Sequence, residues 1–196
     1  MRQVSSTSLS ARTNHKAEDF ALEMNPDMQM QICHDERDCI MGEYPTLSQV
    51  KRDYGSNAPE IWLVPQLANL SEYCGARDKL TRPQLRELAW TIAHDFHYLK
   101  VSELMLFFRR FKSGRYGRFY GSVDPLVITK ALRDFVAERN NAIDHYEREE
   151  KKRRLEEDRK DACTWKEYCM MSGQPERIHE HPLQRPLGKV VHQNPP

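Results

Sequence analysis

Apolar residues recur at helical spacing through the middle of the chain and predict a series of helices there. Thr81 can cap a helix whose apolar stripe is formed by Leu85, Leu88, Ala89, Ile92, Ala93 and Phe96. Ser102 can cap the next helix, which carries Leu104, Met105, Phe107, Phe108 and Phe111. Because this next helix is apolar around much of its circumference, we expect it to be the most buried element.

Two further helices are predicted before these. Thr46 can cap a helix over 47–54, which Gly55 would end. A helix from Pro59 to Tyr73 follows, and Pro65 inside it predicts a kink or a second start because proline has no N–H group.

A long helix is predicted to begin at Asp124-Pro125, a capping side chain followed by a residue with a fixed φ angle. Its apolar face consists of Ile128, Leu132, Phe135, Val136, Ile143 and Tyr146. No sustained strand alternation is visible, so we expect a mainly α fold: a small compact helical domain with a glycine- and aromatic-rich turn and a long protruding charged helix at its C-terminal end.

The apolar face ends after Tyr146, and charged residues dominate 147–161. Acids precede bases by four residues in three pairs, Glu147–Lys151, Glu149–Arg153 and Glu150–Arg154. Each such pair stabilises a helix by about 0.2–0.5 kcal/mol. We therefore expect a solvated helical extension over 147–172, following an α-helical domain over 46–146.

The two ends of the chain look different from this middle part. Residues 1–45 contain polar residues without a helical or strand period, so we expect a weakly ordered segment. Repeated prolines over 173–196 leave no continuous helix or strand and predict a flexible Pro-rich tail.

Composition restricts the function classes. The chain has 196 residues, with 30 Lys and Arg against 29 Asp and Glu, so its net charge of +1 gives no general attraction to polyanions. Any nucleic-acid contact must come from a local patch and should be sensitive to salt. No apolar run approaches the ~20 residues of a membrane span, and no secretory signal is visible. We expect a cytoplasmic protein without a membrane partner.

A local patch of this kind lies at residues 107–121, called here the basic aromatic segment. It holds five cations, six aromatic residues and three glycines, and no acid occurs between Glu103 and Asp124. As a nucleic-acid site, it would offer Arg109, Arg110, Lys112, Arg115, Tyr116, Arg118 and Tyr120 for phosphate and base contacts. As a structural turn, it would pack its aromatic rings and leave its arginines in water.

Signals for catalysis or cofactors are weak. The glycines of the basic aromatic segment lack the Gly-Lys-Ser/Thr ending of a phosphate loop, and His94 with His97 lacks the HExxH spacing of zinc proteases. We name no catalytic residue, no cofactor and no metal site, and we expect a non-enzymatic protein. Whether the pairs Cys33/Cys39 and Cys163/Cys169 together bind zinc stays open.

The run from Lys112 to Gly121 reads Lys-x-Gly-x-Tyr-Gly-x-Phe-Tyr-Gly, and Asp124-Pro125-Leu126-Val127-Ile128-Thr129 follows it. With the preceding residues from Tyr98, this pattern resembles an uncharacterised family found in Bacteroidota genomes, prophages and conjugative elements. The resemblance covers about residues 58 to 145. It implies a mobile-element context but no activity, because the family has none established.

Two functions therefore remain as expectations. The first is an accessory protein of a mobile element or phage, acting in DNA replication or transfer, that contacts nucleic acid through the basic aromatic segment. The second is an adaptor that contacts a replication or host protein, with the charged helix as its docking surface and no nucleic-acid contact. A zinc-dependent or other enzyme is the weakest alternative.

Overall fold

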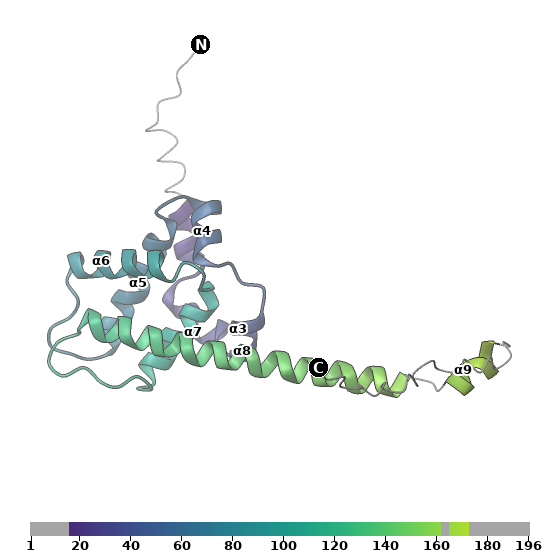
Figure 1. Ribbon diagram of the computed structural model, residues 1–196. Coiled ribbons are helices and arrows are strands. Elements are labelled where there is room, and N and C mark those ends of the chain that lie inside the picture. The colour runs from purple at the N-terminus through teal and green to yellow at the C-terminus, as the bar shows by residue number, and fades with distance from the viewer. Residues whose placement is uncertain (1–15, 162–164, 173–196) are drawn as a thin grey trace, which may run out of the picture. The chain divides into compact units, whose positions relative to one another are not determined.

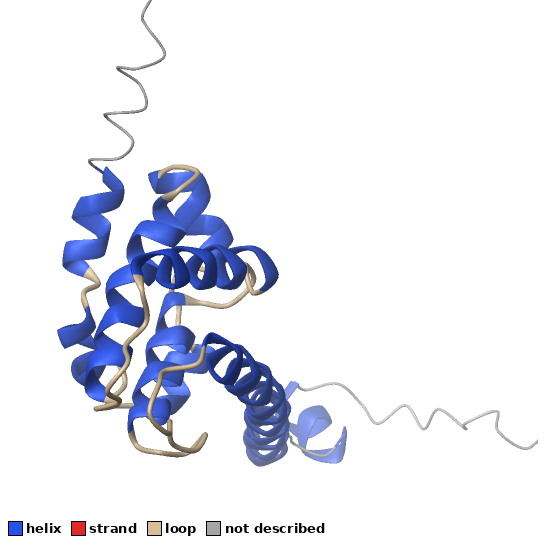
Figure 2. Cartoon of the chain, turned by 90° about the vertical axis from the view of Figure 1, so that its left-hand side faces the viewer, coloured by secondary structure: helices blue, strands red, loops and turns tan. Residues whose placement is uncertain are grey.

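Helices form the regular structure of this protein. The computed structural model describes residues 16–161 and 165–172, and a first helix covers 16–23. The elements that follow are η1 (Pro26–Met28), α2 (Gln29–Ile32), α3 (Glu36–Met41), α4 (Leu47–Tyr54), α5 (Ala58–Tyr73), α6 (Arg82–Asp95), α7 (Val101–Lys112), α8 (Pro125–Asp161) and α9 (Trp165–Ser172). Within these described ranges there is no strand (Figures 1 and 2). The expected mainly α class is confirmed.

The chain divides into two compact units, residues 1–149 and 150–196. Helix α8 contributes its first part to the first unit and its last residues to the second. Among the described residues, no helix combines the length and apolarity that crossing a bilayer requires.

Capping side chains fix the helix starts that the sequence predicts. The Thr46 hydroxyl accepts a hydrogen bond from the Gln49 amide, and the Gln49 side chain accepts one from the Thr46 amide at 2.7 Å. Thr81 and Gln84 form the same capping box at α6. Each cap of this kind typically stabilises a helix by about 1 kcal/mol. Helix α5 runs through Pro65 as one element, so the expected second start does not occur.

The start of α7 differs from the expectation. The helix begins at Val101, with Lys100 in the capping position, and the Glu103 carboxylate accepts from the Lys100 amide at 2.8 Å. Ser102 lies inside the helix and donates to the carbonyl of Cys39 at 2.7 Å. A lysine is not a typical cap, so the sequence pattern placed the start at the nearest serine.

Helix α7 forms the centre of the core, as expected for the most buried element. It contacts α2, α3 and α5, and the Phe107 ring lies 5.7 Å from that of Phe135 on α8. The core residues that the sequence predicts are buried: Leu88, Ile92, Phe96, Leu104, Phe107, Phe108, Leu132 and Phe135. Leu85 is half-buried against them.

The N-terminal segment is more ordered than the sequence predicts. Residues 1–15 lie outside the described part, but 16–45 contain four short helical elements. These elements bury Ala17, Phe20, Cys33, Cys39 and Ile40 in the same core as α7. The Trp62 indole also donates to the Met24 carbonyl at 2.7 Å. Because each short element buries at most two side chains, no periodic stripe develops for a sequence pattern to detect.

The charged stretch is helical, as expected. Helix α8 continues to Asp161, and side chains over 147–160 are exposed except for the half-buried Glu150. Of the predicted pairs, Glu150–Arg154 is present at 3.3 Å, while Arg153 pairs with Glu150 at 2.7 Å and with Glu157 at 3.8 Å. The predicted Pro-rich tail at 173–196 lies outside the described residues.

Candidate functional site

The basic aromatic segment consists of the C-terminal half of α7 and the loop that follows it. Gly114, Gly117 and Gly121 have φ angles of 84°, 98° and 80°, a region that other residues rarely adopt. These glycines let the loop turn back, so that the Phe119 ring stacks on Phe111 with 5.4 Å between centroids. Most aromatic side chains of the segment therefore pack in or against the core.

Arg110 is an internal ion-pair residue. Only 12% of its side chain is exposed, and its guanidinium contacts Glu36 of α3 at 2.6 Å and Glu138 of α8 at 3.2 Å. The hydrogen bond from Arg110 lowers the pKa of Glu36 against the opposing effect of burial. Arg110 joins α3, α7 and α8 and is not on the surface that nucleic acid would contact.

Arg115 and Tyr116 also meet Glu138. The Arg115 guanidinium lies 3.2 Å from this carboxylate, and the Tyr116 hydroxyl donates to it at 3.2 Å. Burial and the negative charge of Glu138 raise the pKa of Tyr116 to about 12. The half-buried Tyr116 ring packs 5.7 Å from Phe107 and 6.0 Å from Phe111, so less of it is available for stacking on a base.

The remaining predicted contact residues fall into two places. Arg109 and Lys112 line a cavity of about 700 Å³ between the end of α7 and the N-terminal helices. Arg118 and Tyr120 lie on the exposed loop, with Tyr120 90% exposed. The seven predicted residues thus lie in three places: three contact Glu138, two line the cavity and two lie on the exposed loop.

The cysteines are only partly described. Cys33 and Cys39 are buried, and the Cys39 thiol donates to the Ile32 carbonyl at 3.3 Å. A hydrogen bond with Cys39, together with burial, raises the pKa of the Cys33 thiol. The side chains of Cys163 and Cys169 lie outside the described residues. Within the described part, no group of three or more metal-binding side chains is present.

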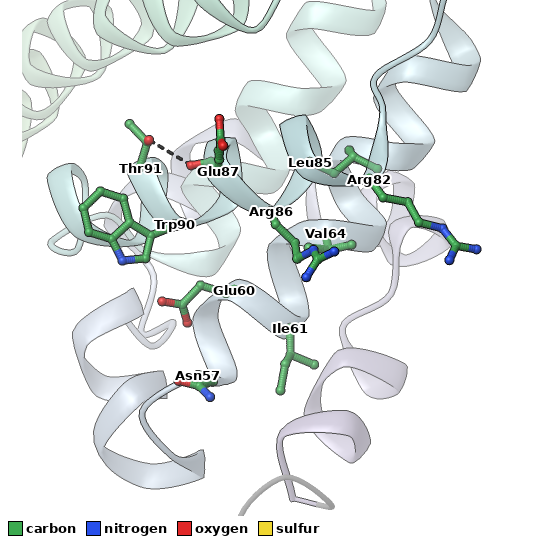
Figure 3. Close-up of a pocket in the computed structure, with 10 residues that line it drawn as sticks. All are labelled: Asn57, Glu60, Ile61, Val64, Arg82, Leu85, Arg86, Glu87, Trp90 and Thr91. Atoms are coloured by element: carbon green, nitrogen blue, oxygen red, sulfur yellow. Dashed lines mark hydrogen bonds between the residues drawn. The ribbon is translucent and has the colours of Figure 1, made fainter.

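A groove of about 1200 Å³ lies between α5 and α6 and is called here the α5–α6 groove. Ile61 and Val64 of α5 and Leu85 and Trp90 of α6 supply its apolar lining (Figure 3). Trp90 is 58% exposed, and its ring stacks on His94 at 5.1 Å. An apolar groove with an exposed indole at its edge is typical of a surface that binds a partner.

Charges in the α5–α6 groove are distributed unevenly. Figure 3 shows Glu60 beside Trp90 towards one end and Arg82 at the other, with Arg86 between them. The Oε2 atom of Glu60 is buried and has no hydrogen-bond partner among the described residues. Leaving such an oxygen unpaired costs about 1–3 kcal/mol.

Sequence reasoning did not predict the α5–α6 groove. The apolar stripes of α5 and α6 were visible, but they predicted burial rather than an open surface. One signal was present: Trp90 lies off the stripe formed by Leu88 and Ile92. A large aromatic residue outside a core stripe is a weak indication of a contact surface.

Part of the chain matches a known protein family. Residues 79–173 match DUF6633, a family of unknown function. The match includes α6, α7, α8 and the basic aromatic segment, while α5 precedes it. Neither the curated proteins nor the solved structures contain a match.

Proposed function

We propose that this protein is a non-enzymatic adaptor that binds a helical segment of a partner protein in the α5–α6 groove. The observation that carries the proposal is an apolar floor combined with the exposed Trp90 and the Glu60 carboxyl group beside it (Figure 3). The buried ion pair of Arg110 with Glu36 and the contact of the half-exposed Arg115 with Glu138 also favour this function over contact with nucleic acid. The proposal keeps the adaptor function that the sequence analysis expects. Its docking surface is the α5–α6 groove instead of the charged helix.

The dimensions of the α5–α6 groove fit a peptide helix. Its volume of about 1200 Å³ exceeds the ~300–1,000 Å³ of typical small-molecule pockets. Amphipathic helices bind such grooves through apolar anchors spaced at i, i+3 or i+4, and i+7. Ile61, Val64 and Leu85 offer an apolar floor that matches those anchors.

The charges specify which helix fits. A Lys or Arg of the partner near Trp90 would pair with the Glu60 carboxylate, which lines the groove. An Asp or Glu towards the opposite end would meet Arg82 or Arg86, both of which are exposed. Complementary charges at the two ends would give the bound helix one preferred direction. We further propose that the partner is a replication or host protein encountered by a mobile element, as the resemblance of residues 58 to 145 implies.

A displayed library of helical peptides tests the proposal. Peptides of about 16 residues are long enough to hold a helix on binding. We expect selection on the wild-type protein to enrich apolar anchors at helical spacing with a base at one end and an acid at the other. Ile61→Glu would place a charge on the apolar floor and should abolish binding of the selected peptides. Peptides without this pattern, or with unchanged affinity for Ile61→Glu, would contradict the proposal.

Nucleic-acid contact is the second candidate function. The observation in its favour is the exposure of Arg118 and Tyr120 on the loop, together with the half-exposed Arg109 of α7. These residues could supply phosphate contacts and one stacking ring. Because Arg110, Arg115 and Tyr116 contact Glu138, we expect such binding to be weaker than the sequence alone suggested.

A further inference from the structure

Lys112 ends α7 as a half-buried cation held by neutral groups. Its ammonium donates to the Gln29 side-chain oxygen at 2.8 Å and also to the Asn69 side-chain oxygen. The Tyr73 ring lies 5.6 Å from the ammonium nitrogen. Among the ion pairs of the described residues, none includes Lys112. Burial lowers the pKa of this ammonium, as expected for a cation that lacks a close counter-charge.

A buried amide relay holds Lys112 in place. Gln29 is 3% exposed and donates to the Gln66 side-chain oxygen at 2.6 Å. Gln66 donates in turn to the Met24 carbonyl at 2.9 Å. The relay orients the Gln29 oxygen towards Lys112, so the ammonium is preorganised rather than mobile. An ammonium has three N–H donors, and the two amide oxygens account for two of them.

Arg109 lies one helical turn before Lys112 and lines the same cavity of about 700 Å³. Its guanidinium donates to the Cys33 carbonyl and lies 3.8 Å from Glu36. Glu36 is engaged more closely by Arg110, at 2.6 Å. Because 45% of the Arg109 side chain remains exposed, its other N–H groups are available to a ligand.

We propose that this cavity binds a ligand through a phosphate group, with Arg109 and Lys112 as its cationic contacts. Two cations match the charge of a phosphate monoester, and arginine offers it a bidentate fork. Tyr73 is 63% exposed at the cavity wall and can contact the rest of the ligand. The volume lies within the ~300–1,000 Å³ typical for small molecules.

Asp27 is the acid on the cavity wall that opposes this proposal. Its negative charge favours the charged form of Lys112, but the two residues do not form one of the ion pairs found among the described residues. Asp27 is exposed, so water screens it more than it screens the half-buried ammonium. The net charge around Lys112 therefore remains positive.

Calorimetry with pyrophosphate and with AMP, at low ionic strength, tests the proposal on the full chain. Labelled oligo-dT in a parallel anisotropy titration separates a free phosphate ligand from a nucleic-acid backbone. We expect saturable binding of at least one probe, and a loss of about tenfold or more in Arg109→Gln and in Lys112→Met, since each removes a charged hydrogen bond. Arg133→Gln is the matched control, because Arg133 is exposed on α8 outside the cavity.

Each result of these titrations either supports or contradicts the proposed phosphate site. Lys112→Met strips Gln29 and Asn69 of their donor, so if circular dichroism shows that it does not fold, Arg109→Gln decides alone. Binding of oligo-dT only, weakened by Arg109→Gln, would keep the phosphate site and identify its source as nucleic acid. If no probe binds the wild-type protein, or if Arg109→Gln binds as the wild type does, the site does not exist.

Discussion

Glu138 brings three side chains of the basic aromatic segment onto one carboxylate. Arg110, Arg115 and the Tyr116 hydroxyl each lie 3.2 Å from it. An acid on α8 thereby offsets part of the positive charge of a sequence run that itself contains no acid. The local charge of a segment is therefore a poor measure of the charge that the folded surface presents.

Arg118 gives the cleanest residue-scale test of nucleic-acid contact. Fluorescence anisotropy with single- and double-stranded DNA at low salt should show weak, sequence-independent binding that falls as salt rises. Arg118→Ala should reduce it without changing stability, because this side chain is exposed on the loop. Arg133→Ala is the control on α8. Absence of binding by the wild-type protein would remove this function.

Glu36 gives a pH-dependent prediction. Its pKa in the folded protein is lowered, first of all by the hydrogen bond from Arg110. A lowered pKa stabilises the fold above the unfolded-state value of about 4.3, and the stabilisation is lost as pH falls through the folded-state value. Since 38% of the Glu36 side chain is exposed, Glu36→Gln should cost only about 1 kcal/mol near pH 7.

Urea unfolding at about pH 7 and about pH 3 measures this difference. The difference in the free energy of unfolding between the wild-type protein and Glu36→Gln should narrow towards the lower pH, because the stabilisation is lost as pH falls through the lowered folded-state pKa of Glu36. Glu72→Gln, at an exposed position on α5, should show little difference at either pH. A gap for Glu36→Gln that persists at low pH would mean that size or shape, not charge, explains the effect.

The helices with long apolar stripes could be predicted from the sequence, whereas the helical elements of only a few residues could not. The stripes of α6, α7 and α8 span several turns, so their core faces follow from spacing alone. The elements η1, α2 and α3 have three, four and six residues, too few for a period to emerge. Their stability comes from contacts with distant residues, such as the hydrogen bonds from Gln29 of α2 to Gln66 of α5 and from Ser102 of α7 to the Cys39 carbonyl of α3.

Helix α8 supplies a test of the core at the element scale. Leu132 is fully buried there, so Leu132→Ala should lower the free energy of unfolding by about 2–5 kcal/mol. Leu126→Ala on the same helix removes a side chain that is 76% exposed and should have little effect. Denaturant titration compares the two. A cost below about 1 kcal/mol for Leu132→Ala would contradict the packing described.

The end of α8 should behave differently from its beginning. Over 147–161 the helix relies on exposed pairs such as Glu150–Arg154, which are weak and screened by salt. Hydrogen exchange should therefore be faster there than in α7, and faster still at high salt. Protection over 147–161 equal to that of α7 would indicate a contact partner for this stretch.

At the scale of the whole molecule, the site depends on how helices are placed rather than on any one of them. The α5–α6 groove forms where Ile61 and Val64 face Leu85 and Trp90, and no sequence spacing reports the gap between two helices. The cavity at Arg109 and Lys112 likewise requires the N-terminal helices that sequence patterns missed. The helical class was predictable, but these concave surfaces needed the tertiary arrangement.

The affinity of a selected helical peptide for Trp90→Ala tests the adaptor proposal most directly. A tryptophan that becomes buried in an interface often contributes about 2 kcal/mol or more, so the dissociation constant should rise roughly thirtyfold. Leu126→Ala, which removes an exposed leucine outside the groove, should leave the affinity unchanged. Equal affinity of the peptide for the wild-type protein and for Trp90→Ala would show that the α5–α6 groove is not the docking site.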